Sequence, residues 1–179
     1  MKTPTMFRLL LFVVVLITAP AVYGQTDATR DKTKERLSAL LTRVGPEINV
    51  TFATHPKNPF SFIGVMTEGL TNAEKLEIVI SATASQTIGI QVFPHYKGNY
   101  VNIDKVRNTV QLLRKLVQLN ETNFLFWGAD ATGDVFTGYT FTLESGFPDE
   151  ALKIVLSSIK GTDKYVGELR PSIDGSNAP

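Results

Sequence analysis

Alternation of apolar and other residues in the middle of the chain limits the fold more than any other feature of the sequence. It occurs in three runs: Phe60, Phe62 and Met66; Leu76, Ile78, Ile80 and Ala82; and Ile88, Ile90 and Val92. Side chains of a β-strand point alternately to the two faces of a sheet, so this period of two predicts strands. Ser85 and Gln86 have about the length of a hairpin turn, and the second and third strands are predicted to pair antiparallel.

Two segments near the ends of the chain have the three- and four-residue spacing of a helix face. The first runs from about Asp31 to Val44 and is stopped by Gly45-Pro46. The other begins at Pro148, has acidic residues in its first turn, and ends before Gly161. Its predicted buried residues are Leu152, Val155, Leu156 and Ile159.

The clearest helical pattern follows Asn102, whose side-chain oxygen can cap the helix. One apolar face steps by three and four residues through Ile103, Val106, Val110, Leu113 and Val117. Three more leucines, Leu112, Leu116 and Leu119, widen that face. Such a helix must lie flat against a sheet or be covered from two sides.

Residues 123–129 and 135–144 predict two further strands, joined by a hairpin turn in which Gly133 can take a positive φ. The order of elements is therefore α-β-β-β-α-β-β-α. We predict an α+β fold in which one antiparallel five-stranded sheet packs against helices. Residues 167–179 predict a flexible tail.

The first 24 residues predict an export signal rather than part of the fold. Lys2 and Arg8 form a positive start, residues 9–18 are dominated by apolar side chains, and small residues follow. Cleavage is predicted after Gly24, with Ala21 as the alternative. A membrane-spanning helix competes with this interpretation, but the apolar run is shorter than the ~20 residues that a bilayer requires. We therefore expect a periplasmic or extracellular protein with no stable membrane insertion after cleavage.

Composition excludes several classes of protein. The chain has no cysteine, which excludes a disulfide scaffold, a Cys-ligated metal site and a thiol nucleophile. Loss of Lys2 and Arg8 with the signal leaves 16 basic against 17 acidic residues, a net charge of −1. This balance does not favour binding to nucleic acid or to a membrane surface. Asn49 and Asn120 begin Asn-X-Thr sequons, which matter only in a eukaryotic source.

Four stretches in the second half of the chain resemble the YbjN-like family of bacteria. They are residues 112–120, which end in Leu-Asn, the strand 124–127, the turn 130–135 with its Asp-Gly elements, and residues 139–147. The resemblance implies a domain over residues 30–160. It also implies a fold similar to the α/β sandwich of type III secretion chaperones, and a regulatory or protein-binding role to which no catalytic residues are attached.

We name no catalytic, cofactor or metal site from the sequence. His55 and His95 both adjoin prolines and are interpreted as ordinary loop residues. Ser145 has no glycine before it at the spacing of a nucleophile elbow, and we expect it to cap the last helix.

The last hairpin contains a pattern of oxygen ligands that resembles a calcium loop. Asp130, Thr132 and Asp134 alternate across its turn. The turn lacks the bidentate glutamate and the length of an EF-hand loop, so we predict a plain hairpin.

This hairpin also carries the candidate binding residues, because both of its faces are apolar. Val135, Tyr139, Phe141 and Leu143 share the face that we expect under the helices, and Phe136 points the other way. With a two-residue turn Leu125 and Trp127 share the face of Phe136, whereas a three-residue turn puts Phe124 and Phe126 there. Either register leaves at least three large apolar side chains on the second face. Another helix, a second copy or a bound polypeptide must then cover them.

The leading hypothesis is an exported, non-enzymatic module, chaperone-like or regulatory, that binds a protein partner or dimerises through Phe136, Trp127 and Leu125. One alternative is a small hydrolase or ligand-binding enzyme whose acids and Thr or Ser converge only in three dimensions. A concave pocket with two carboxylates, or a histidine of shifted pKa, would favour that alternative. A purely structural envelope component is the third hypothesis.

Overall fold

The computed structural model describes residues 27–175. Its helices are α1 (Asp27–Val44), η1 (Gly45–Ile48), α2 (Thr109–Thr122), α3 (Asp149–Ser158), η2 (Ile159–Gly161) and α4 (Thr162–Asp174). Its strands are β1 (Ala53–His55), β2 (Asn58–Met66), β3 (Lys75–Ala82), β4 (Thr87–Tyr96), β5 (Asn99–Tyr100), β6 (Phe126–Ala129) and β7 (Val135–Thr142). The predicted export signal, with both candidate cleavage sites, and residues 176–179 lie outside the described residues.

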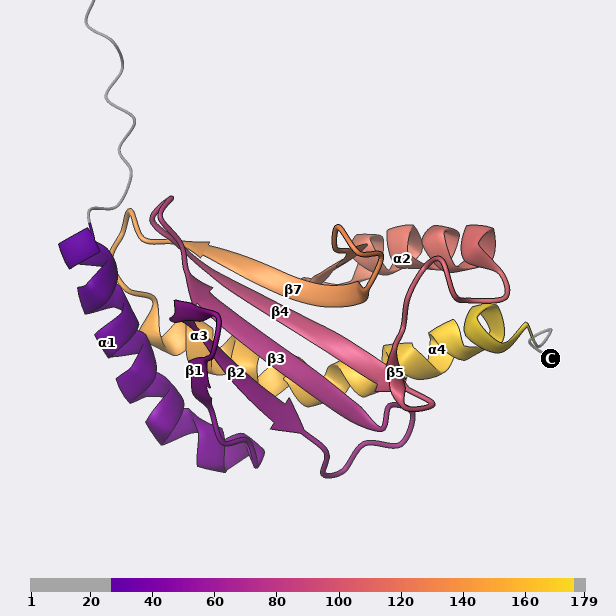
Figure 1. The fold of residues 1–179 in the computed structure, drawn as a ribbon, viewed down its shortest axis with the longest axis horizontal. Coiled ribbons are helices and arrows are strands. Elements are labelled where there is room, and N and C mark those ends of the chain that lie inside the picture. Colours follow the sequence, from indigo (N-terminus) through magenta and orange to yellow (C-terminus); the bar gives the residue numbers. More distant parts are fainter. Residues whose placement is uncertain (1–26, 176–179) are drawn as a thin grey trace, which may run out of the picture.

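All the strands belong to one antiparallel sheet, in the order β1-β2-β3-β4-β7-β6, with β5 paired to β4 (Figure 1). The predicted α+β class is therefore confirmed, as is the hairpin between β3 and β4, where Gln86 adopts φ 54°. Within residues 27–175 the sheet has seven strands rather than the predicted five. The two short strands that the prediction missed, β1 and β5, have three and two residues, too few to show an alternating pattern.

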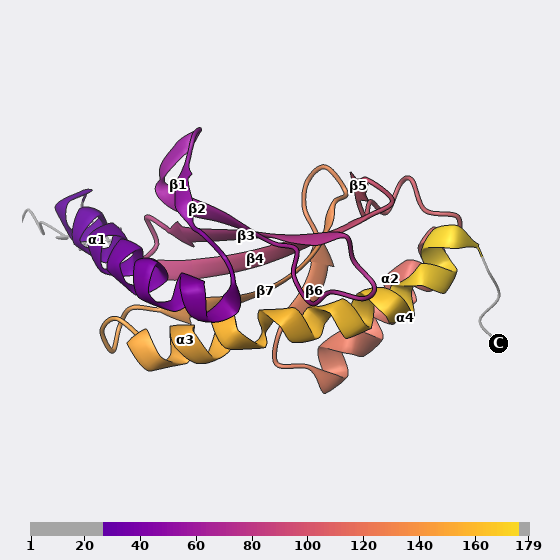
Figure 2. The same cartoon turned by 90° about the horizontal axis from the view of Figure 1, so that it is seen from below.

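The alternating runs point their apolar side chains toward the helices. Leu76, Ile78 and Ile80 of β3 are fully buried, and they belong to the same core cluster as the apolar residues of α1 and α3. Figure 2 shows α3 and α4 running along one side of the sheet, with α1 at one end and α2 at the other. A second cluster joins α2, α4 and β6. None of the helices within residues 27–175 is long and apolar enough to cross a bilayer.

The predicted start of α2 is wrong, and its predicted apolar face is right only for the three leucines. The helix begins at Thr109 and is capped by Asn108, whose side chain accepts a hydrogen bond from the backbone N–H of Gln111. Asn102 instead donates its side-chain amide to the β6–β7 turn, at Thr132 O and Asp134 Oδ1. The buried residues are Leu112, Leu116 and Leu119, while Val110, Leu113 and Val117 are exposed. The sequence offers two apolar faces, and packing against α4 and β6 selects the leucine face.

The predicted tail from Gly167 is also wrong, because residues 162–174 form a helix of the core. Val166 and Leu169 of α4 are fully buried. Gly167, the first residue of the predicted tail, lies close to a loop of the sheet: a Cβ at Gly167 would lie 2.7 Å from Asn72 Oδ1. The domain therefore extends past residue 160 to the end of α4.

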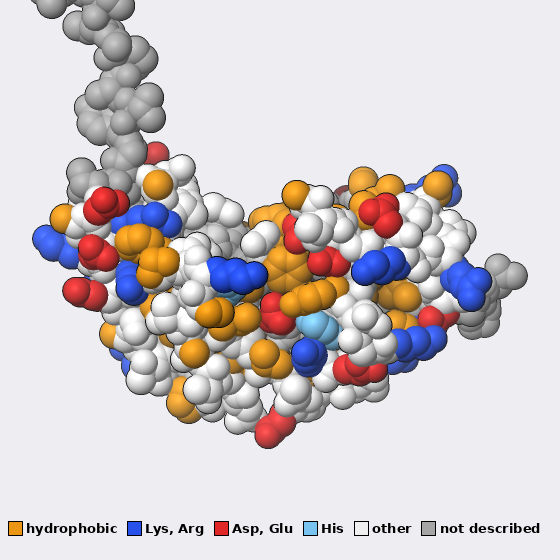
Figure 3. Space-filling model, in the orientation of Figure 1, with side chains coloured by type: hydrophobic (Ala, Val, Ile, Leu, Met, Phe, Trp, Pro, Cys, Tyr) orange, Lys and Arg blue, Asp and Glu red, His pale blue; other side chains and the backbone are white. Residues whose placement is uncertain are grey.

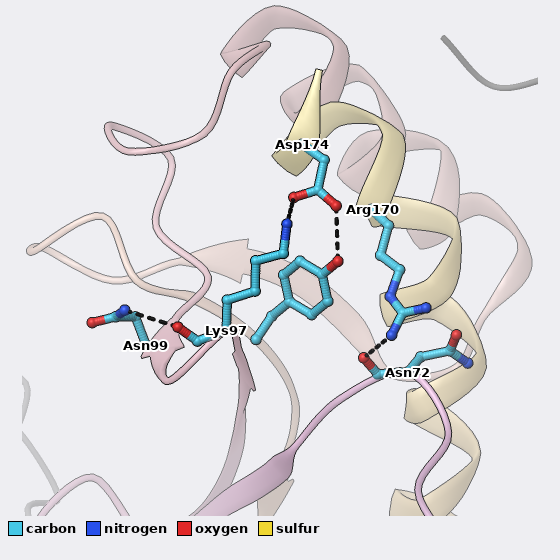
Figure 4. Close-up of polar contacts among 6 residues, drawn as sticks. Asn72, Lys97, Asn99, Arg170 and Asp174 are labelled. Carbon is cyan, nitrogen blue, oxygen red and sulfur yellow. Dashed lines mark hydrogen bonds and ion pairs between the residues drawn. The ribbon is translucent and has the colours of Figure 1, made fainter. Parts of the chain in front are cut away.

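Both ends of α4 are attached to loops of the sheet. At its start, the Asp163 carboxylate accepts hydrogen bonds from the backbone N–H groups of residues 71, 72 and 73. At its end, Asp174 accepts hydrogen bonds from Lys97 Nζ at 2.7 Å and from the Tyr96 hydroxyl at 2.8 Å (Figure 4). Arg170 donates to the backbone oxygen of Asn72 and lies over the ring of Tyr96.

Candidate binding surface on the open face of the sheet

The strand register separates a face covered by helices from a face that we call the open face. The open face includes Ile63 and Val65 of β2, Lys75, Glu77 and Val79 of β3, Gln91, Phe93 and His95 of β4, Phe126 and Gly128 of β6, and Phe136 and Gly138 of β7. No helix formed by residues 27–175 covers this face. Figure 3 shows it with hydrophobic side chains interrupted by charged ones.

The register of the last hairpin decides which of the candidate residues lie on the open face. Phe126 pairs with Gly138 and Trp127 with Thr137, so Phe126 shares the face of Phe136 and Trp127 does not. This side assignment is the one expected for the three-residue turn. Leu125 and Trp127 are about 95% buried on the helix side, so these two cannot form the proposed contact surface. Of the three candidates, Phe136 alone lies on the open face.

Three phenylalanines from three strands form a cluster on this face, which we call the phenylalanine cluster. The ring of Phe136 lies 5.6 Å from that of Phe93 and 5.7 Å from that of Phe126, the latter edge-on. Phe136 is only 9% exposed, whereas 42% of Phe126 is exposed. The sequence analysis missed Phe93, although its position follows from the phase of β4: with Ile90 and Val92 pointing inward, residue 93 must point outward.

Two glycines next to the cluster differ in the room around them. A Cβ at Gly138 would lie 2.3 Å from the backbone oxygen of Ile90, and Phe126 packs over the same position. A Cβ at Gly128 would meet only the Phe136 ring, at 3.7 Å. Gly138 thus allows close approach of β4 and β7 beneath the exposed ring.

A polar group lies beside the phenylalanine cluster. The Tyr100 hydroxyl donates to Glu77 Oε1 at 2.8 Å, and the other carboxylate oxygen lies 3.8 Å from His95 Nε2. The His95 and Tyr100 rings are 4.0 Å apart, and Tyr100 also meets Phe93 edge-on at 6.0 Å. His95 Nε2 is buried without a hydrogen-bond partner among the described residues.

The surroundings of this group shift the pKa of both rings. Burial, and then the nearby Lys75 ammonium, lower the pKa of His95 below its ordinary 6.5, against the opposite pull of Glu77, Glu74 and Asp134. Burial and the hydrogen bond to Glu77 raise the pKa of Tyr100 to about 12. His95 is therefore predominantly neutral at pH 7.

Neither histidine lies in a loop, contrary to the sequence-based interpretation. His55 ends β1, and His95 lies within β4 and is 5% exposed. Pro94 does not interrupt β4, because the pairing of β4 with β7 ends at Val92, and beyond it the Pro94 carbonyl accepts a hydrogen bond from the backbone N–H of Val101, so no N–H of residue 94 is needed.

The turn between β6 and β7 is a hairpin, as predicted. Asp130 Oδ1 accepts hydrogen bonds from the backbone N–H groups of Thr132 and Asp134 and from the Thr132 hydroxyl. Burial would raise the pKa of Asp130, but these hydrogen bonds together lower it. Gly133 adopts φ 82°. No cluster of metal-ligating side chains occurs among residues 27–175.

The outer edge of β6 is occupied by a side chain of α2. Asn120 accepts a hydrogen bond from the backbone N–H of Trp127 and donates to the backbone oxygen of the same residue. The amide therefore takes the place of a neighbouring strand.

The expected role of Ser145 is wrong. The cap position of α3 is Pro148 and has no side-chain hydrogen bond, while Ser145 is exposed in the preceding turn. Gly146, at φ 96°, turns the chain between Ser145 and the helix. The predicted acidic first turn, Asp149 and Glu150, is confirmed.

A cleft of about 630 Å³ lies between α1 and the strands β1 and β2 and is separate from the open face. Its lining includes the carboxylates of Asp31 and Glu35 and the hydroxyls of Ser38, Thr42 and Thr54. Four of these residues are exposed, and Ser38 is half-buried. The cleft brings together acids and hydroxyls but neither histidine.

Comparisons with known proteins identify no relative. No protein-family model matches the sequence, and no curated protein matches it significantly. Membership of the YbjN-like family therefore stays a prediction.

Proposed function

We propose that this protein is an exported, non-enzymatic binding module that docks a protein partner on the open face of its sheet. The observation that carries the proposal is Phe126, which leaves 42% of its surface in solvent although it packs against Phe136 and Gly138. Aromatic side chains of this kind are the usual anchors of protein interfaces. The export signal predicted from the first 24 residues supports a periplasmic or extracellular location. A chaperone-like or regulatory role would use the same surface.

The neighbourhood of Phe126 supports docking of protein rather than of a small molecule. Val65, Glu77 and Phe93 are successive cross-strand neighbours, and Phe136 follows them across the sheet. Val65 at the far end of this row is 41% exposed. The row combines three apolar side chains with the carboxylate of Glu77, and Lys75 lies beside it. Protein interfaces contain such a mixture of apolar and polar groups.

Affinity purification from the native compartment tests this proposal. The wild type should co-purify with a protein partner, and Phe126→Asp should lose that partner. Ile154→Asp is the matched control, because Ile154 is an equally apolar, 66% exposed residue on the outer side of α3. A partner that is retained by Phe126→Asp and lost by Ile154→Asp would contradict the proposal.

The cleft beside α1 supports a second candidate function, a ligand-binding or hydrolytic site. Two carboxylates and three hydroxyls converge there from α1 and β1. A thermal-shift screen of small ligands would test it, with Ser38→Trp as the variant that fills the cleft. A ligand whose stabilising shift disappears in Ser38→Trp would favour this candidate, and equal shifts in both proteins would contradict it.

A further inference from the structure

One exposed apolar surface plays no part in the open face. Val110, Leu113 and Val117 of α2 are 69%, 43% and 70% exposed. Their spacing of three and four residues aligns them on one side of the helix, as in the seam of a coiled coil. We call them the α2 stripe. α2 lies at the rim of the molecule, and its leucine side is already packed on α4 and β6 (Figure 1).

Two charged residues accompany the stripe. Arg114 follows Val110 by four residues and Glu121 follows Val117 by four, so each lies one turn along the helix on the same edge of the stripe. Both are exposed, and neither forms an ion pair with another residue of the described range. By contrast, Lys115 points elsewhere and pairs with Glu168 of α4 at 2.7 Å.

This pattern is self-complementary in one orientation. Arg114 and Glu121 are seven residues apart, about 10 Å along the helix at 1.5 Å per residue. When two α2 helices run antiparallel about a twofold axis at the level of Val117 and Gln118, Arg114 of each copy lies opposite Glu121 of the other. Val117 then meets its own counterpart next to the axis. A parallel arrangement would put Arg114 and Glu121 of the two copies on opposite edges of the contact, so neither ion pair would form.

We infer that the α2 stripe is the contact between two copies of this chain, packed antiparallel with two reciprocal Arg114–Glu121 ion pairs. This contact goes beyond the proposed function and uses a different surface. It also accounts for the broad apolar pattern of the sequence, since the leucine side of α2 is covered within the chain and the valine side is covered by a second copy. The open faces of both copies remain free to dock a partner.

Light scattering on the chain from Gln25 to Pro179, across 1–200 µM at low salt, tests this inference. The wild type should dimerise, and Arg114→Glu or Glu121→Arg alone should weaken the dimer at least tenfold, because each sets like charges against each other twice. The double variant Arg114→Glu/Glu121→Arg should return to within about threefold of the wild-type dissociation constant. The charge reversal Lys115→Glu, on the other side of the same helix, should leave the dimer intact.

Four results would overturn the inference: a wild type that is monomeric at 200 µM, single variants that dimerise like the wild type, a double variant that does not recover, or a dimer that survives Val117→Asp. If the dimer is lost only in Phe126→Asp, the contact lies on the open face and not on the α2 stripe. Circular dichroism confirms that each variant is folded. Because the changed side chains are exposed, the double variant separates loss of contact from loss of structure.

Discussion

The two faces of this sheet are built from the same strands and have opposite compositions. On the helix side, β3 presents Leu76, Ile78 and Ile80, all fully buried. On the open side, the same strand presents Lys75, Glu77 and Val79, all half-buried. The helix side contributes to stability through close packing, while the open side keeps charged residues and an exposed phenylalanine next to each other. A surface that is neither fully polar nor fully buried is typical of sites that meet another molecule.

Truncation of two neighbouring residues on β3 gives the largest expected difference between the faces. Ile78→Ala removes a fully buried side chain and should lower the free energy of unfolding by about 3–4 kcal/mol. Val79→Ala, on the open face, should cost about 1 kcal/mol or less, because Val79 is only half-buried. Urea unfolding of both variants measures the difference. Equal losses would mean that the open face is packed like a core.

Removal of the Asp163 carboxylate, which attaches the start of α4 to the sheet, is expected to have the next largest effect. Asp163→Ala leaves the backbone N–H groups of residues 71–73, of which that of Ala73 is buried, without their acceptor, and should lower the free energy of unfolding by about 2–3 kcal/mol. The matched control is Asp149→Ala, which removes an exposed ion pair with Arg36 and should cost less than about 1 kcal/mol. Both values come from urea unfolding. A negligible loss in Asp163→Ala would mean that the Asp163 contacts do not hold residues 162–174 to the sheet.

Alanine substitution of the two glycines beside the phenylalanine cluster tests how closely the strands pack under the open face. Gly138→Ala should destabilise by about 1–3 kcal/mol, because its Cβ would collide with the backbone of β4. Gly128→Ala should change stability little, since its Cβ would make an ordinary contact with the ring of Phe136. Thermal unfolding midpoints distinguish the two. Equal midpoints would show that β4 and β7 can separate beneath Phe126.

Acidification is expected to have the smallest effect. Since the pKa of His95 is lowered on folding, the unfolded chain binds the proton more tightly. Neutral His95 therefore makes its full contribution to the free energy of unfolding above about pH 6.5. This contribution is lost as the pH falls from there through the lower pKa of the folded protein. The difference in unfolding free energy between wild type and His95→Gln should narrow over that range. His55→Gln is the control, and a difference that is constant with pH would contradict the buried position of His95.

The sequence was sufficient for the features that depend on local pattern. The alternating runs predicted β2, β3 and β4, and the turn residues predicted both hairpins. Where a pattern fitted two arrangements, the sequence could not decide between them. In α2, either the valine or the leucine side could be buried, and only contact with α4 and β6 decides. The residues from Gly167 were interpreted as a tail because the contacts that hold α4, such as the close approach of Gly167 to Asn72, join residues far apart in the chain.

The candidate surface was also predictable only in part, because some of it follows from local pattern and the rest from contacts between distant residues. Phe136 follows from the alternation of β7, whereas the sides taken by Leu125 and Trp127 depend on the register across residues 130–134. Phe93 could have been found from the phase of β4. The polar group could not, because Tyr100 reaches Glu77 and His95 through β5, a strand of two residues.

Site-specific photo-cross-linking tests the central claim most directly. A benzoylphenylalanine at position 126 replaces an aromatic ring by a reactive one at the exposed edge of the phenylalanine cluster, and the same residue at position 154 reports on the outer side of α3. In the native compartment, we predict a discrete protein adduct from position 126 and none from position 154. Irradiation that yields no adduct at position 126, or equal adducts at both positions, would contradict docking on the open face.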